Sequence, residues 1–325
     1  MARSLLTVAA VIIILAGMKI AQSIIVPCLL ALFLAVLTAP AVRWLVKWKL
    51  PIPIAIGIVV ALVFAVFYIL GTLVATSADD FFNHLPEYES TFDNGLAYLR
   101  ERLPWLRVDL QSLAPPDSFI SFAGRLFSGV GSILVAVALT IFILIFMLYE
   151  AQNLPEKARR ALGNSVDMTF ARRFSDSVQR YLAIKCLVST VTGVVVWALI
   201  KLMGVDYPIL WGTFAFLMNF IPNIGSLIAA VPPMFLATVQ LGWPGLLISG
   251  LGFGAINAVI GNLLEPRLMG RSLDLSTLVV FISLVFWGWL LGPVGALLAV
   301  PLTVVVKIGL ELYPKSRWLA VLLSQ

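Results

Sequence analysis

The chain has 325 residues, of which 61% are hydrophobic and only 12% are charged. A soluble globular domain is close to half apolar and about one quarter charged, so this composition excludes that class and predicts an all-α polytopic membrane protein in a lipid bilayer. The formal net charge of +6 does not indicate binding to nucleic acid, because the basic residues lie between apolar runs. Their placement reports membrane topology instead.

The sequence contains no enzyme or cofactor signature. A Walker loop, His-Glu-x-x-His and Gly-x-Ser-x-Gly are all absent. The single histidine, His84, has no neighbouring Cys or His and is expected to be an ordinary surface residue rather than a metal ligand. Cys28 and Cys186 lie in apolar runs, which predicts inert packing rather than a disulfide. We therefore expect no catalysis, no metal and no other cofactor, and any transport should proceed without ATP.

Residues 1–76 are predicted to form the N-terminal transmembrane helices. The first apolar run, 5–16, resembles a secretory signal, but no clean cleavage site follows it, so a retained helix at 5–20 is expected. Further helices are predicted at 24–42 and 52–76. The segment between these two helices is basic and aromatic, as is typical of a membrane boundary. It contains Arg43, Trp44, Lys47, Trp48 and Lys49.

Residues 77–127 differ in composition from the segments on either side. They are rich in Asp and Glu with scattered aromatic and leucine residues, and Pro115-Pro116 ends this pattern. This pattern predicts a small helical segment outside the membrane. In residues 128–180, a fourth transmembrane helix at 130–149 precedes a basic stretch with an apolar residue at every fourth position. That spacing predicts an amphipathic helix, either on the cytoplasmic leaflet or packed on the protein's own inner face.

A fifth helix is predicted at 181–203, followed by an apolar run that is interrupted at residues 219–225. This stretch reads Asn-Phe-Ile-Pro-Asn-Ile-Gly. Pro222 cannot donate a backbone hydrogen bond and Gly225 tolerates backbone angles that other residues avoid, so a helix should break here. Asn219 and Asn223 place donors and acceptors at the break. A polar break inside an apolar segment is where a membrane protein is expected to hold a solute.

A sixth long helix is predicted at 246–264, after a turn at Gly242-Trp-Pro-Gly245. A polar loop at 265–274 follows, and the last apolar region, 275–306, is broken at Gly292-Pro293. The stretch from Gly225 to Pro232 resembles the stretch from Gly295 to Pro301. This similarity indicates either an internal repeat of a broken hairpin or chance among small apolar residues.

Most of the 22 Lys and Arg residues fall on one side if both termini are cytoplasmic, which places 77–127 in the periplasm. This topology requires the two broken regions to enter and leave on one side each. Their 13-residue arms, such as 208–220, would rise about 20 Å as helices, short of the ~30 Å hydrocarbon core. We therefore predict about six full transmembrane helices and two re-entrant hairpins of opposite orientation. The alternative is that both hairpins are tilted full spans.

Three stretches carry a resemblance to a known family. The break at 219–225, the stretch Gly261-Asn-Leu-Leu-Glu-Pro-Arg-Leu-Met-Gly270, and Phe286-Trp-Gly-Trp-Leu-Leu-Gly-Pro-Val-Gly295 with Pro301-Leu resemble the AI-2E (autoinducer-2 exporter) family. The resemblance covers most of 181–311 and is nearest to the branch that exports the signal autoinducer-2. The family also includes proteins assigned as Na⁺(Li⁺)/H⁺ antiporters. Membership implies a bacterial inner-membrane homo-oligomer, with a pentamer among the assemblies it allows.

These observations assign residues 181–325 as a transport core. The expected solute pathway consists of the hairpin tips and two asparagines: Asn219, Pro222, Asn223, Gly225, Asn257, Asn262, Gly292, Pro293 and Gly295. Glu265, Pro266 and Arg267 are either a gate or a helix stop with a local ion pair, and the asparagines either contact solute or join helices. No carboxylate falls in the middle of an apolar run, which disfavours an antiporter. The sequence therefore predicts export of a small polar neutral solute, with antiport or a non-transporting assembly role as alternatives.

Overall fold

The structure is a computed structural model that describes residues 2–102, 130–162, 169–222, 224–269, 275–312 and 317–324. Every regular element in these ranges is a helix, which confirms the predicted all-α fold. Several predictions lie partly outside the described residues. These are the end of the acidic segment at Pro115-Pro116, part of the amphipathic stretch, Asn223 at the first break, and the polar loop after Met269.

The helices keep the order that the apolar runs predict. The N-terminal part contains α1 (Ala2–Ile20), α2 (Gln22–Lys47), α3 (Ile52–Arg102) and α6 (Val130–Leu162). The middle contains α7 (Thr169–Met203), α8 (Pro208–Met218), α9 (Ile224–Ile256), the π-helix η1 (Asn257–Leu264) and α10 (Glu265–Met269). The C-terminal part contains α11 (Thr277–Leu297), α12 (Ala299–Leu312) and α13 (Arg317–Leu323).

Within the described residues, five helical segments are long and apolar enough to cross a membrane. They are Gln22–Lys47, Ile52–Ser77, Ser175–Met203, Ile224–Leu268 and Leu278–Leu297. Shorter apolar helices cover Val137–Gln152 and Pro208–Met218. The protein is therefore polytopic, as predicted. The membrane orientation of each span stays a prediction.

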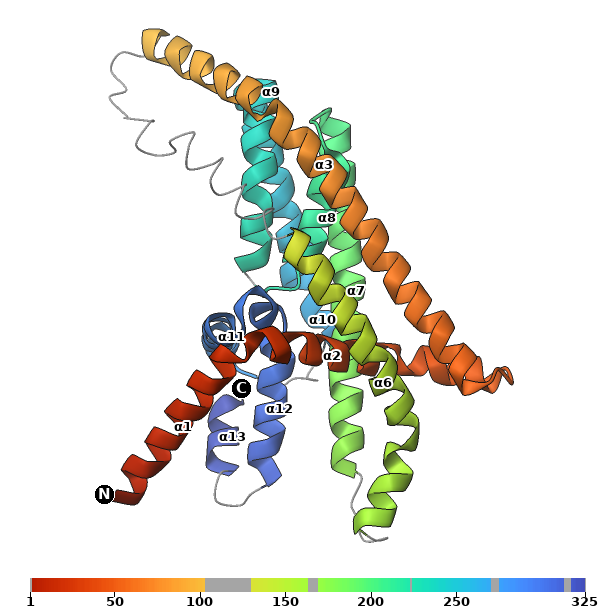
Figure 1. Ribbon diagram of the computed structural model, residues 1–325. Coiled ribbons are helices and arrows are strands. Elements are labelled where there is room, and N and C mark those ends of the chain that lie inside the picture. The colour runs from red at the N-terminus through yellow and green to blue at the C-terminus, as the bar shows by residue number, and fades with distance from the viewer. Residues whose placement is uncertain are drawn as a thin grey trace. The chain divides into compact units, whose positions relative to one another are not determined.

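The described residues fall into two compact units that do not follow chain order. The first lies within 1–66, 135–185 and 268–325, and the second within 67–134 and 186–267. The helices α3 and α7 each continue from one unit into the other, and α3 runs without interruption from Ile52 to Arg102 (Figure 1). The predicted boundaries at residues 76, 127 and 180 are not tested by this grouping and stay predictions.

In the second unit, α8 and the start of α9 form a tight hairpin. The chain leaves α8 through short-range bonds from Phe220 N to Leu217 O at 3.3 Å and from Ile221 N to Met218 O at 2.9 Å. The helix ends here because Pro222 has no N–H and disfavours helical angles in the preceding residue. A Cβ on Gly225 would overlap the Met218 carbonyl oxygen, so only glycine permits this approach. With 11 residues, α8 rises about 16 Å.

The helix α9 reverses direction at Gly242, where the sequence predicts a turn. Gly242 has φ 69° and ψ −154°, angles that are essentially confined to glycine. A Cβ on Gly245 would overlap the carbonyl oxygen of Ala237, eight residues earlier. These groups would lie about 12 Å apart along a straight helix, so the chain must fold back. Figure 1 shows the two arms of α9 beside each other.

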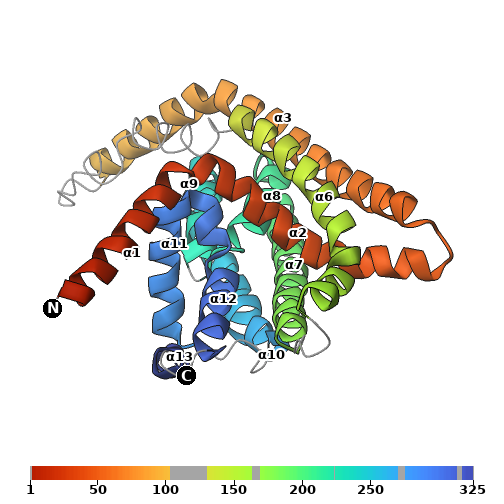
Figure 2. The same cartoon turned by 60° about the horizontal axis from the view of Figure 1, so that its bottom comes forward.

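In the first unit, α11 turns in the same way at Gly292, with φ 69° and ψ −156°. A Cβ on Gly295 would overlap the Trp287 carbonyl oxygen, and α11 packs along α12 (Figure 2). Leu-Gly-x-x-Gly at 241–245 and at 291–295 therefore forms the same turn twice. The predicted match between 225–232 and 295–301 is not tested by these angles and stays a prediction.

Candidate functional site

The second unit contains a cavity beside the break between α8 and α9. Its volume is about 20 Å³, enough for one water molecule. The cavity is bounded by α7, α8, both arms of α9 and η1. Its lining residues are Thr192, Val196, Ala215, Asn219, Ser226, Ala229, Phe253, Ile256, Asn257, Ile260 and Gly261. The break that the sequence predicts as a solute site therefore does border a cavity.

The break places Asn219 on the cavity wall. Asn219 caps the C-terminus of α8 and is only 8% exposed. Its Nδ2 donates a hydrogen bond of 3.0 Å to Oγ of Ser189 on α7, and Ser189 is fully buried. Because a buried amide needs partners, this bond fixes the side chain between α7 and the break.

Another part of the cavity wall is a π-helix. In η1, which follows α9, the backbone bonds span one more residue than in an α-helix, and such segments occur frequently at functional sites. Asn257, Ile260 and Gly261 of η1 all line the cavity. The extra residue per turn therefore determines which side chains of this segment face the cavity.

The cavity wall is mostly apolar, with four polar residues and no charged residue. Its polar members are Thr192, Asn219, Ser226 and Asn257, and Thr192 Oγ1 also donates to its own helix, to Val188 O at 2.9 Å. Amides and hydroxyls can both donate and accept hydrogen bonds, so they suit a neutral solute with hydroxyl or carbonyl groups. At about 20 Å³, the cavity would hold a solute larger than water only if its walls separated.

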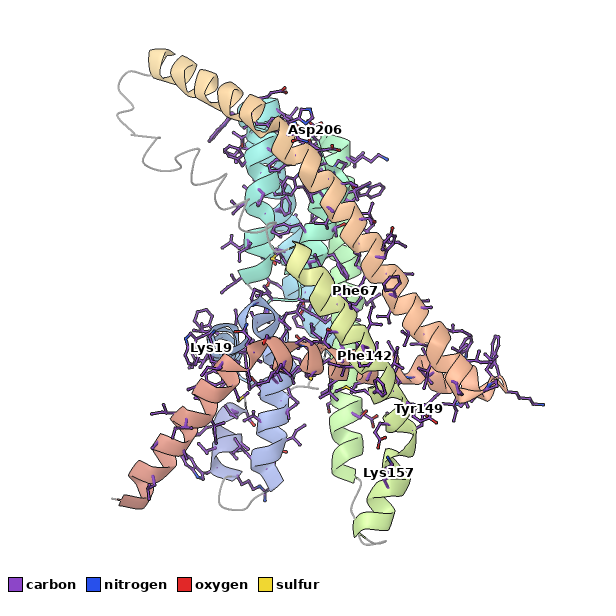
Figure 3. All side chains as sticks on the ribbon, in the orientation of Figure 1. Lys19, Phe67, Phe142, Tyr149, Lys157 and Asp206 are labelled. Carbon is purple, nitrogen blue, oxygen red and sulfur yellow. The ribbon has the colours of Figure 1, made fainter. Side chains whose placement is uncertain are left out.

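The helix α3 joins the two open ends of the α8–α9 hairpin. Tyr88 Oη of α3 donates to Asp206 Oδ2 at 2.8 Å, and Asp206 N donates to Gln240 Oε1 at 3.1 Å. Gln240 Nε2 also donates to the same carboxylate. Figure 3 shows Asp206 where α3 passes this end. Partial burial, followed by the bond to Asp206, raises the pKa of the Tyr88 phenol above its usual range.

Aromatic packing supports this contact. Phe81 of α3 is buried and makes edge-on contacts with the rings of Tyr207 and Trp211, whose centroids lie 5.8 Å and 5.5 Å away. Such arrangements add to the stability that burial provides. The end of the hairpin farthest from the break is therefore anchored, while the break faces the cavity.

The structure places two of the predicted site residues, Asn219 and Asn257, on one cavity. Pro222 and Gly225 shape the adjoining break, and Asn223 lies outside the described residues. Asn262 is an exposed residue of η1 that does not line this cavity. The predicted gate residues Glu265, Pro266 and Arg267 lie in α10, directly after η1. Gly292, Pro293 and Gly295 belong to the turn in the other unit.

Sequence reasoning missed nine of the eleven residues of the wall, among them Thr192, Ser226 and Gly261. A signal was available for Thr192, since Ser189, Thr190 and Thr192 form a polar cluster in an apolar helix. Ser226 directly follows Gly225 of the break. Gly261 begins a stretch that carries the family resemblance, but nothing in its residue type indicated a place on a cavity.

Comparison with known proteins identifies the family. The profile described as AI-2E family transporter matches residues 8–315. YhhT of Escherichia coli (strain K12), whose name assigns transport provisionally and no solute, is 41% identical over 98% of this chain and 93% of its own. The AI-2 transport protein TqsA of the same strain is 38% identical, over 96% of this chain and 93% of its own. A Haemophilus influenzae protein, also named provisionally for transport, is 40% identical over 99% of this chain and 96% of its own. The chain is therefore a multi-span membrane transporter rather than an enzyme, and it belongs to the AI-2E family.

Proposed function

We propose that this chain exports a small, neutral, polar solute, autoinducer-2, across the bacterial inner membrane without ATP. The observation that carries the proposal is the cavity between the α8–α9 break and η1, whose mostly apolar wall holds two amides and two hydroxyls and no charge. Groups of this kind can replace the water that a neutral solute sheds, without requiring a compensating ion. The two broken hairpins within the transport core would supply the alternating access.

Similarity supports the choice of solute. TqsA is named as an AI-2 transport protein, and this chain matches it over nearly its whole length. YhhT is similarly close and its name gives no solute. Autoinducer-2 is therefore our choice among the solutes that the family carries, and it agrees with the absence of charge on the cavity wall.

Cation/proton antiport is the second candidate. Lys185 in α7 and Lys307 in α12 are 3% and 5% exposed, and ionisable residues at such positions often serve ion pathways. Both lysines belong to the first unit, whereas the cavity belongs to the second. We therefore propose that they support structure or coupling rather than bind the solute.

The membrane arrangement forms part of the proposal. Both termini and the basic segments would be cytoplasmic, and residues 77–127 periplasmic. The exposed apolar side chains of the spans would contact lipid and neighbouring subunits of a homo-oligomer, such as a pentamer. Glu265, Pro266 and Arg267 would act as a gate at the cytoplasmic end of η1.

The experiment that tests the proposal measures autoinducer-2 outside cells that lack their own exporter. Restoring this chain should raise the extracellular signal and lower the intracellular signal. Sodium-dependent proton release from everted vesicles, without movement of the signal, would support antiport instead. If neither activity appears with the chain present in the membrane, the role is an assembly or regulatory one.

A further inference from the structure

Gly261 and Asn257 meet within η1. A Cβ built on Gly261 would lie 2.7 Å from Oδ1 and 3.7 Å from Cγ of Asn257. A separation of 2.7 Å is shorter than any ordinary contact between a methyl carbon and an oxygen, so an alanine here must displace something. The displaced group is the end of a short side chain, which can rotate about its own bonds. The expected result of the substitution is therefore a moved carboxamide rather than a disrupted helix.

Both residues line the same cavity. Asn257 is the polar residue that η1 contributes to the wall, and Asn219 is the other amide on this wall. A neutral solute in the cavity would be recognised by the position of these donors and acceptors. A change in the position of the Asn257 carboxamide would therefore alter which solute fits, even though the charge of the wall stays the same.

We infer that Gly261 is a positioning residue: it leaves the space that holds the Asn257 carboxamide on the cavity wall, and through that group it sets the selectivity for neutral polar solutes. This inference rests on the proposed function, because it assumes that the solute passes this cavity. The chain supplies a matched control. Gly254 lies in the second arm of α9, and a Cβ there would meet nothing within 4 Å. Gly261→Ala and Gly254→Ala gain the same intrinsic helix propensity.

The steric part is tested without any solute, by thermal unfolding of the purified protein. Gly254→Ala should raise Tm by about 1–3 °C, whether residue 257 is Asn or Ala. With Asn257 present, Gly261→Ala should raise Tm by less than Gly254→Ala does. In a chain that already carries Asn257→Ala, adding Gly261→Ala should raise Tm by as much as Gly254→Ala. Equal shifts for Gly261→Ala in the two backgrounds would show that the glycine does not hold the carboxamide and would overturn the inference.

The selectivity part is tested by uptake of autoinducer-2 and of glycerol and ribose into everted vesicles. Gly261→Ala should lower autoinducer-2 uptake about fivefold, the loss expected for one misplaced hydrogen bond, and change its ratio to the other solutes. Asn257→Ala should give the same loss, and the double variant no further loss. A Gly261→Ala variant that behaves like Gly254→Ala would overturn the inference. A wild type that moves no solute would overturn the proposed function, and the unfolding cycle would then decide the inference by itself.

Discussion

Replacing Asn219 by leucine tests the cavity most sharply, because leucine has a similar volume and no hydrogen-bonding group. The variant removes one amide from the wall and the donor that reaches Ser189 Oγ at 3.0 Å. Hydrogen bonds between membrane helices contribute about 0.6 kcal/mol on average and rarely more than about 1.7 kcal/mol. We therefore expect a stability loss of about 1 kcal/mol, small enough for the protein to assemble.

The transport rate of Asn219→Leu should fall by more than the small loss of stability would explain. A solute that passes the leucine sheds water without replacement, which costs about 1–3 kcal/mol. This corresponds to a loss of about 5- to 150-fold in the transport rate. The assay is export of autoinducer-2 by cells without another exporter, normalised to the amount of the chain in the membrane. The sequence predicts a similar loss for Asn223→Leu at the same break.

Ser189→Ala separates the two roles of Asn219. It breaks the same hydrogen bond but leaves the amide on the wall, so it should lower stability as Asn219→Leu does and lower transport less. Thr190→Val is the matched control, since the Thr190 hydroxyl is exposed and bonds to Cys186 O of its own helix at 2.8 Å. Normal transport by well-folded Asn219→Leu would refute the argument. The solute path would then have to run elsewhere.

Three further predictions concern the turns, the α3 contact and the topology. Gly242→Ala and Gly292→Ala should each lower the free energy of unfolding by about 1–3 kcal/mol, because their backbone angles suit only glycine. The Tm of each variant should lie well below that of the control Gly57→Ala, where a Cβ meets open space. Because the pKa of Tyr88 is raised, the contribution of this phenol to stability is complete below pH ~10 and is lost as the pH rises above that value. The drop in Tm between pH 8 and pH 11 should therefore be smaller in Tyr88→Phe than in the wild type. Ser90→Cys, in a chain without its own cysteines, should react with an impermeant thiol reagent in intact cells. Labelling only after lysis would reverse the proposed topology.

The elements that the sequence predicts correctly are those with local causes. Pro222 ends a helix whatever surrounds it, because the missing N–H and the ring act on neighbouring residues. The turns at Gly242 and Gly292 are visible as Gly-Pro clusters between apolar runs. The apolar runs themselves are long enough to indicate membrane spans. Each of these signals needs only a few adjacent residues.

The features that escaped prediction depend on packing between distant segments. Nothing in the sequence pairs Ser189 with Asn219, since the bond between them requires α7 to lie against the break. Thr192 resembles any threonine that bonds to its own helix, and only its place on the cavity distinguishes it. A π-helix has no residue signature, so the rotation that brings Asn257 and Gly261 to the wall could be seen only in the backbone.

The most direct test of the account is uptake of autoinducer-2 by everted membrane vesicles that contain this chain. The vesicles would come from cells without another exporter, and would be energised by a respiratory substrate in the absence of ATP. We predict uptake in wild-type vesicles, at least about fivefold slower uptake with Asn219→Leu, and no dependence on sodium. Wild-type vesicles that take up no more signal than vesicles without the chain would contradict the central claim that this cavity carries a small neutral polar solute.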